Sequence, residues 1–186
     1  MRIVNADAFE YAENIMPYEN FDYAFVDTWR DASDGLIMYE KMKKLEGNME
    51  GFISNAAFIS NNANMVADGG INEGTIAGDG NMVVAGDFFN SATIAQATLA
   101  VENGNTLINA GEITAGLNNE GAIVNDNMLT ATTGTNAGSI EGTGSLNING
   151  NFTNEDNKVI HQGEVNINSG VFANAGEVSG IINNAA

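Results

Sequence analysis

Apolar and polar residues alternate along short stretches of residues 51–186. The stretch 146–152 (LNINGNF) places Leu, Ile and Phe on one face and three asparagines on the other. Residues 165–168 (VNIN) and 98–102 (TLAVE) follow the same rule. A period of two is typical of a half-buried β-strand, so the sequence predicts many short strands, with glycines at the turns between them.

The alternating pattern itself recurs at a longer interval. Residues 72–89 and 136–153 align without a gap as Asn-x-Gly-[Ser/Thr]-Ile-x-Gly-x-Gly-x-[Met/Leu]-x-[Val/Ile]-x-Gly-x-Phe. Weaker copies begin at Asn55, Asn90, Asn109, Asn119, Asn154 and Asn174. Most neighbouring starts are 17 to 20 residues apart, and the step of 10 from Asn109 to Asn119 is the exception. Such a period predicts a mainly β chain, folded as a parallel β-solenoid (β-helix) with about 18 residues per coil.

Stacking of the coils in register leads to two predictions about side chains. Because each repeat opens on an asparagine, these amides are expected to form a ladder along the rod, each bonding the next. Seven or so coils at about 4.8 Å each would give a rod on the order of 35 Å long. The predicted interior stripe comprises Ile76, Met82, Val84, Phe88, Ile94, Leu99, Val101, Ile113, Ile123, Ile140, Leu146, Ile148, Phe152, Val165, Ile167, Val171 and Val178.

A second solenoid interpretation competes with the 18-residue unit. Two sets of apolar residues are spaced by six, with a small residue two places before each member. The sets are Ile76, Met82, Phe88 and Ile94, and Ile140, Leu146 and Phe152. This spacing resembles the hexapeptide left-handed β-helix of acyltransferases. The hexad fails after Ile94, because position 100 is Ala and position 106 is Thr, and we favour the 18-residue unit.

Residues 1–50 differ in composition and predict a different structure. They hold Trp29, all four tyrosines and five of the six basic residues, but only two of the 22 glycines. Residues 2–5 and the aromatic-rich stretch 21–29 are typical of strands, and helices are expected over 8–15 and before Gly47. The order β-α-β-α is the unit of a parallel sheet. We therefore expect two domains, a short α/β segment over 1–50 and the solenoid over 51–186.

Three phrases of the repeat carry a family resemblance: NEGTIAG (72–78), NAGEITAG (109–116) and NAGSIEG (136–142). They resemble the repeats of filamentous-haemagglutinin-type adhesins and autotransporter passenger domains, over residues 55–186 or so. The resemblance implies a right-handed parallel β-helix that is exported to a bacterial surface. The start of the chain lacks the long uncharged apolar core of a signal peptide. The location is therefore open between the cell surface or secretion, as part of a longer exported protein, and the cytoplasm.

Residues 1–46 resemble part of a class I S-adenosylmethionine-dependent methyltransferase of the spermidine-synthase-like type. The resemblance rests on NADAF (5–9) and FVDTW (25–29), with support from SDGL (33–36). It implies that Asp7 contacts the adenine amino group of the cofactor S-adenosylmethionine. It also implies that Asp27 and Trp29 lie at the substrate end of a strand.

Two parts of that family's cofactor site are missing from this segment. No Gly-rich loop follows a first strand, and no acidic residue ends a second strand to hold the ribose. We therefore favour a chain without enzymatic activity or cofactor, and keep the methyltransferase, or a subunit of one, as the rival function. Residues 1–50 are otherwise explained as a cap on the solenoid end or as a remnant joined to an unrelated repeat.

The charge of the chain excludes several classes of partner. The net charge is −18, of which residues 51–186 carry −12 with Lys158 as their single cation. Nucleic acids and anionic membranes are disfavoured by such a surface. No stretch approaches the roughly 18 to 20 apolar residues that span a bilayer, and the absence of Cys excludes disulfides and thiolate metal sites. The expected partners are a protein or carbohydrate surface, or further copies of the chain.

Few residues of the repeat region point to chemistry. His161, the single histidine, is expected at a turn or on the surface, and it would be the base of a hexapeptide-type acyltransferase, the third function considered. Residues 78–81 and 154–157 offer oxygen ligands for Ca²⁺, but no calcium-binding repeat recurs and no metal is expected. The sequence thus favours a structural or adhesive rod with an acidic surface.

Overall fold

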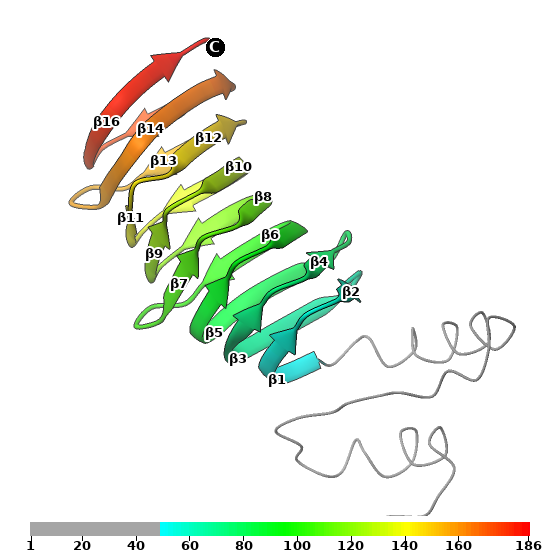
Figure 1. The fold of residues 1–186 in the computed structure, drawn as a ribbon. Coiled ribbons are helices and arrows are strands. Elements are labelled where there is room, and N and C mark those ends of the chain that lie inside the picture. Colours follow the sequence, from blue (N-terminus) through cyan, green and yellow to red (C-terminus); the bar gives the residue numbers. More distant parts are fainter. Residues whose placement is uncertain (1–48) are drawn as a thin grey trace, which may run out of the picture.

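The structure is a computed structural model, and it describes residues 49–186. These residues form a sheet of sixteen strands that winds into a rod, without any helix (Figure 1). The strands in chain order are β1 (Met49–Asn55), β2 (Phe58–Ser60), β3 (Asn64–Asn72), β4 (Thr75–Ala77), β5 (Asn81–Asn90), β6 (Thr93–Val101), β7 (Thr106–Asn109), β8 (Glu112–Asn119), β9 (Ala122–Asn125), β10 (Met128–Asn136), β11 (Ser139–Glu141), β12 (Ser145–Asn149), β13 (Phe152–Asn154), β14 (Val159–Ser169), β15 (Phe172–Asn174) and β16 (Glu177–Asn184).

All strand pairings in the rod are parallel, and each joins one turn of the chain to the next. The described residues make about eight turns of about 17 residues each. The predicted parallel β-solenoid is confirmed, while its hand stays a prediction. β1 is the first strand that the structure describes, and the domain boundary expected at residue 50 stays a prediction. The predicted α/β segment lies outside the described residues.

Each turn has three sides, and each side points one column of residues into the rod. Side 1 comprises Met65, Met82, Leu99, Leu117, Gly134, Phe152 and Phe172. Side 2 follows it along the chain and comprises Ile53, Gly70, Phe88, Leu107, Ile123, Ile140, Ile160 and Val178. Side 3 completes the turn with Ile59, Ile76, Ile94, Ile113, Leu129, Leu146, Val165 and Ile182.

The six-residue spacing in the sequence is the step from one side to the next. The four apolar residues from Ile76 to Ile94 lie on sides 3, 1, 2 and 3 in turn, and all are buried. After Ile94 the next residues of the three columns are Leu99 and Leu107, five and then eight positions on. The longer step contains a loop, residues 102–105. The two competing interpretations therefore describe one coil, whose three sides have unequal lengths.

The interior is apolar along the whole rod, as the alternating pattern predicts. All of the predicted interior residues are buried except Val171 and Val178. Val178 is half-buried and packs against the core. The prediction that Val171 points inward is wrong, because its side chain is 64% exposed. Gly170, with a φ of 79°, interrupts the alternation, so Phe172 is the residue that stacks in register on Phe152.

Buried asparagines form two ladders at the corners of the coil. Asn55, Asn72, Asn90, Asn109 and Asn125 stack at the end of side 2, and each Nδ2 donates to the next Oδ1 at 2.7 to 2.8 Å. Asn119, Asn136, Asn154 and Asn174 stack in the same way at the end of side 1. The predicted ladder is therefore confirmed, but as two ladders rather than one.

The ten-residue step from Asn109 to Asn119 is the change from one ladder to the other. Asn72 and Asn136, which open the two best-matching repeats, lie in different ladders. The 64 residues between them cover eleven sides, which is three full turns and two further sides. The same residue pattern thus fits side 2 in one turn and side 1 in another. This equivalence of sides explains why the exception occurs.

At two corner positions a glycine stands where a ladder would have an asparagine. In each case the glutamine on the next turn reaches past the glycine to the asparagine beyond it. Gly78 separates Asn61 from Gln96, and the Asn61 Nδ2 donates to the Gln96 Oε1 at 2.5 Å. Gly142 separates Asn125 from Gln162 in the same way, with a distance of 2.6 Å. A Cβ at Gly78 would lie 2.1 Å from the Asn61 carbonyl oxygen. Glycine therefore makes room, and the longer glutamine side chain crosses the gap.

Candidate functional site: an acidic edge of the rod

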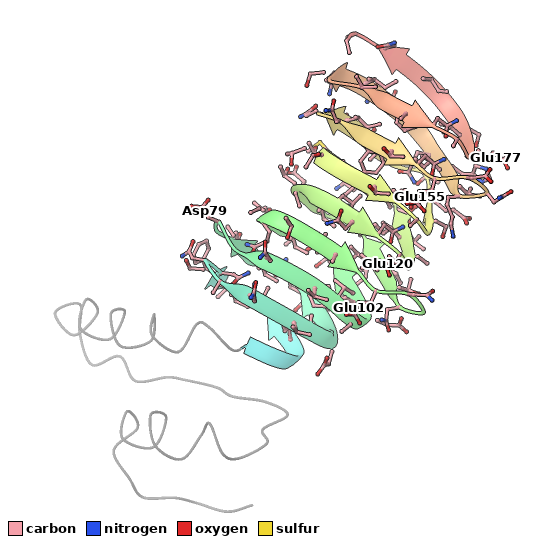
Figure 2. All side chains as sticks on the ribbon, turned by 180° about the vertical axis from the view of Figure 1, so that it is seen from behind. Asp79, Glu102, Glu120, Glu155 and Glu177 are labelled. Atoms are coloured by element: carbon pink, nitrogen blue, oxygen red, sulfur yellow. The ribbon has the colours of Figure 1, made fainter. Side chains whose placement is uncertain are left out.

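Half of the fourteen carboxylates of residues 49–186 lie at one corner of the coil, between side 1 and side 2. We call this corner the acidic edge. It comprises Asp68, Asp87, Glu102, Glu120, Glu155, Asp156 and, at the start of side 2, Glu177; all are exposed. Figure 2 shows Glu102, Glu120, Glu155 and Glu177 along one edge of the rod, with Asp79 on the opposite edge. The charge of the rod is therefore concentrated along one line.

Two loops of the same design widen this edge. Residues 102–105 and 155–158 form long corners, whereas the two turns that lie between them have short corners at residues 120–121 and 137–138 (Figure 1). The Asn105 N–H donates to the Glu102 carbonyl at 3.2 Å, and the Lys158 N–H donates to the Glu155 carbonyl at 3.2 Å. The third residue of each loop is left-handed, with φ of 86° at Gly104 and 60° at Asn157. Each loop is thus a closed turn that begins with an exposed glutamate.

A shallow hollow lies between the two loops. It is lined by residues 103–106, 120–122 and 137–139 and by Lys158. A second hollow beside it is lined by residues 156–159 and 175–177, so Lys158 borders both. The first hollow is walled by backbone and by the short polar side chains of Asn103, Thr106 and Ser139. It offers hydrogen-bonding groups and no aromatic ring for stacking.

The electrostatics of the edge favour a cationic partner. Adjacent parallel strands are about 4.8 Å apart, so the carboxylates of Glu102 and Glu120 stand on neighbouring turns. Like charges along one edge repel each other, and salt weakens that repulsion. Within residues 49–186 Lys158 is the only Lys or Arg that can offset this repulsion. A partner that brings positive charge to the edge would relieve it.

His161 lies on the outer surface of side 2, as expected from the sequence. Its Nε2 is 3.1 Å from the Glu177 Oε1 on the next turn, and its side chain is 40% exposed. Gln162, its neighbour, is the residue that enters the buried ladder. His161 therefore contacts a carboxylate at the upper end of the acidic edge.

The residues considered for Ca²⁺ do not converge in the structure. Asp79 is exposed at the corner between sides 3 and 1, while Asn154 is buried in a ladder. Asp156 accepts a hydrogen bond from Asn157 at 2.8 Å at the tip of its loop. Among the described residues, no group of three or more His, Asp or Glu side chains is placed to hold a metal ion. Asp7, Asp27 and Trp29 of the methyltransferase interpretation lie outside the described residues.

Sequence reasoning did not find the acidic edge, although a signal for it was present. Glu120 and Glu155 each follow a ladder asparagine directly, and Glu102 follows Val101, which occupies the same corner one turn earlier. Aligning the residues after each corner would have brought these glutamates together. The different lengths of the corners hid the alignment.

Comparisons with known proteins leave the site to be interpreted from its own geometry. No model of a known protein family matches the chain, and no curated protein or solved structure matches it significantly. Among residues 49–186, no helix is long and apolar enough to cross a membrane.

Proposed function

We propose that this chain is a structural repeat protein that adheres, through its acidic edge, to a basic surface of a partner protein. The observation that carries the proposal is the line of exposed carboxylates along this corner, which is interrupted only at residues 137–139 and is accompanied by one lysine. The solenoid holds these groups at fixed spacing because every turn is hydrogen-bonded to its neighbours. Binding to such a row needs little ordering of backbone, which lowers the entropic cost of association.

The other partners considered from the sequence are less well supported by this geometry. A second copy of the chain would bring one acidic edge against another, and like charges that meet cost free energy. A neutral glycan gains no charge attraction from the carboxylates, and the hollow between the loops has no aromatic ring to stack on a sugar. A protein with clustered lysines and arginines gains both attraction and a fast electrostatically steered approach.

The proposal is tested by moving the same charge change to two different places. One variant carries Glu102→Gln, Glu120→Gln and Glu155→Gln on the edge. The matched control carries Glu73→Gln, Glu112→Gln and Glu164→Gln, three exposed glutamates away from the edge. Binding of each protein to immobilised poly-L-lysine is measured over a range of salt concentrations. We expect the edge variant to bind at least about tenfold more weakly than the control, because it has lost three charged contacts with the polylysine. Its binding should also depend less steeply on the salt concentration.

Equal weakening of the two variants would contradict the proposal. Both have the same net charge, so an equal effect would mean that attraction follows total charge and not the edge. Unchanged binding in the edge variant would contradict it as well.

A further inference from the structure

The two long loops of the acidic edge match each other position by position. Each begins with an exposed glutamate, Glu102 or Glu155, whose carbonyl accepts the N–H of the fourth loop residue at 3.2 Å. The third residue of each loop is left-handed. The second position, however, carries Asp156 in one loop and Asn103 in the other. The loop 102–105 therefore has an amide where the loop 155–158 has a carboxylate.

Asn103 is followed by a glycine at the tip of its loop. Both residues are exposed, and a Cβ placed on Gly104 would have no atom within 4 Å. The hydrogen bond that closes the loop runs from the Asn105 N–H to the Glu102 carbonyl, and it uses neither the Asn103 side chain nor the Gly104 N–H. The Asn103 amide and the backbone nitrogen that follows it are thus both open to water and to each other.

We propose that Asn103 deamidates spontaneously in the folded protein and so adds a carboxylate to the acidic edge. The Gly104 nitrogen gives up its proton and attacks the Asn103 Cγ, because glycine has no side chain to hinder the approach. A cyclic imide forms as the Cγ–Nδ2 bond breaks, and Nδ2 leaves as ammonia with that proton. Water then opens the ring at either of its carbonyl carbons, which gives aspartate or isoaspartate, and nothing is oxidised or reduced.

The loop 155–158 shows that an aspartate fits at this position. Asp156 is exposed at the tip of its loop, directly after Glu155, and it accepts a hydrogen bond from the Asn157 amide at 2.8 Å. That loop therefore carries two carboxylates in succession. Deamidation to aspartate would give Glu102 the same neighbour and make the two loops alike in charge.

A second Asn-Gly sequence in the rod, Asn149-Gly150, is held in place by its neighbours. Asn149 ends β12, and its Oδ1 accepts a hydrogen bond from the Asn168 amide at 2.9 Å. A Cβ on Gly150 would collide with the carbonyl of Thr132 on the previous turn. Backbone that is packed between two turns reaches the geometry of the imide only by local opening, which costs free energy. The same dipeptide should therefore react at residue 103 and be protected at residue 149.

Peptide mass spectrometry of the full chain tests the proposal. The protein is incubated at mildly alkaline pH, which favours loss of the backbone proton, and is then digested with a protease that cuts after glutamate. Residues 103–112 and 142–155 are released as separate peptides with one Asn-Gly sequence each, and fragmentation locates the modified residue. We expect deamidation at Asn103 to be at least about tenfold faster than at Asn149, because only the loop tip is open. Equal rates in the folded protein would overturn the proposal.

Concentrated urea supplies the reference for this comparison. In the unfolded chain the two Asn-Gly sequences should react within about threefold of each other, since the strand no longer protects Asn149. A tenfold difference that persists in urea would also overturn the proposal, because the sequence around each site and not the fold would then decide the rate.

The variant Gly104→Asn separates this route from others. The equivalent residue of the second loop is Asn157, with a φ of 60°, so asparagine is compatible with the left-handed tip. The variant should keep the β-sheet circular dichroism of the parent and slow deamidation at Asn103 at least about tenfold, since the new side chain hinders the attack. An unchanged rate, or a product located at Asn105 instead, would contradict the proposal.

The deamidation does not rest on the proposed adhesion, although its product would strengthen that adhesion. Asn103→Asp should bind immobilised poly-L-lysine more tightly than the parent, with a steeper salt dependence, because it adds one charge to the edge. Unchanged binding would contradict this effect on adhesion, whereas the deamidation is judged by mass spectrometry alone.

Discussion

At the scale of single residues, the rod depends on buried amides, of which Asn72 uses all of its hydrogen-bonding groups. Asn72 donates to the Asn90 Oδ1 and to the Thr93 carbonyl, and its own Oδ1 accepts from the Asn55 amide and the Gly74 N–H. A buried polar group is costly unless it is paired, and the ladder pairs each of its inner asparagines with the turn above and the turn below. The side chains that specify the register are therefore asparagines, and the apolar columns supply the bulk of the burial.

Removing one rung of the ladder should be costly. Asn90→Ala removes one of the two partners of the Asn72 Nδ2 and of the Asn109 Oδ1, which keep only the Thr93 carbonyl and the Gly111 N–H. We therefore expect a loss of about 1 to 3 kcal/mol in the free energy of unfolding. Asn81→Ala is the control, because Asn81 lies on the same strand but is exposed, with its amide bonded to Asn64. Urea unfolding should show less than about 1 kcal/mol for the control. Equal losses would contradict the role of the ladder.

Asn119, the first asparagine of the second ladder, allows the opposite test, in which an amide is added to a ladder and not removed. The Oδ1 of Asn119 is buried and has no hydrogen-bond partner, because the residue beneath it is Val101. Val101→Asn places an amide donor below this oxygen, whereas Val84→Asn, one turn earlier, places an amide next to Ala67 and Val101. We expect Val101→Asn to cost at least about 1 kcal/mol less than Val84→Asn in urea unfolding. The reverse order would mean that the ladder cannot be extended.

At the scale of elements, each strand is fixed by the alternation of residues between core and solvent. β12 shows this in two neighbouring positions, since Ile148 is fully buried and Asn149 is exposed. Asn149 also accepts a hydrogen bond from Asn168 at 2.9 Å, on the outside of the rod. Because the period is two, a shift of one residue would exchange the faces of the whole strand.

Two substitutions on β12 test the assignment of faces. Ile148→Asp buries a carboxylate without a partner and should cost at least about 4 kcal/mol or prevent folding. Asn149→Asp keeps the acceptor for the Asn168 amide and should change the free energy of unfolding by less than about 0.5 kcal/mol. The two values come from thermal or urea unfolding of the purified variants. Similar effects at both positions would show that the faces are wrongly assigned.

Elements also show where sequence reasoning succeeded and where it failed. The strands and most of the inward residues follow from local alternation, because a strand that is half-buried must place its apolar residues every second position. The prediction that Val171 points inward failed because Gly170 has a positive φ that breaks the alternation, and the residue pattern alone does not reveal that φ. The acidic edge depends on which residues stack in neighbouring turns. That register was hidden by the loops at 102–105 and 155–158, which make successive turns unequal in length.

At the scale of the whole molecule, one stacking rule accounts for the rod and for its acidic edge. Every turn repeats three sides, so a residue type that recurs at one phase becomes a line along the rod. Asparagines make buried lines, apolar residues at inward positions make the core, and acidic residues at one corner make the acidic edge. The period of the sequence predicts the rod itself, and only the register between turns separates these lines from one another.

Engineered disulfides give the most direct test of this register, because the chain has no native cysteine. Thr75 and Thr93 are paired in register on β4 and β6, whereas Ala95 lies two positions further along β6. Neighbouring parallel strands bring paired Cα atoms to about 4.8 Å, within the range of a disulfide of about 4.4 to 6.8 Å. The register between β4 and β6 predicts that the variant with Thr75→Cys and Thr93→Cys forms an intramolecular disulfide on mild oxidation, as measured by mass spectrometry. The variant with Thr75→Cys and Ala95→Cys should not form one. Preferential cross-linking of the second pair, or of neither, would contradict it.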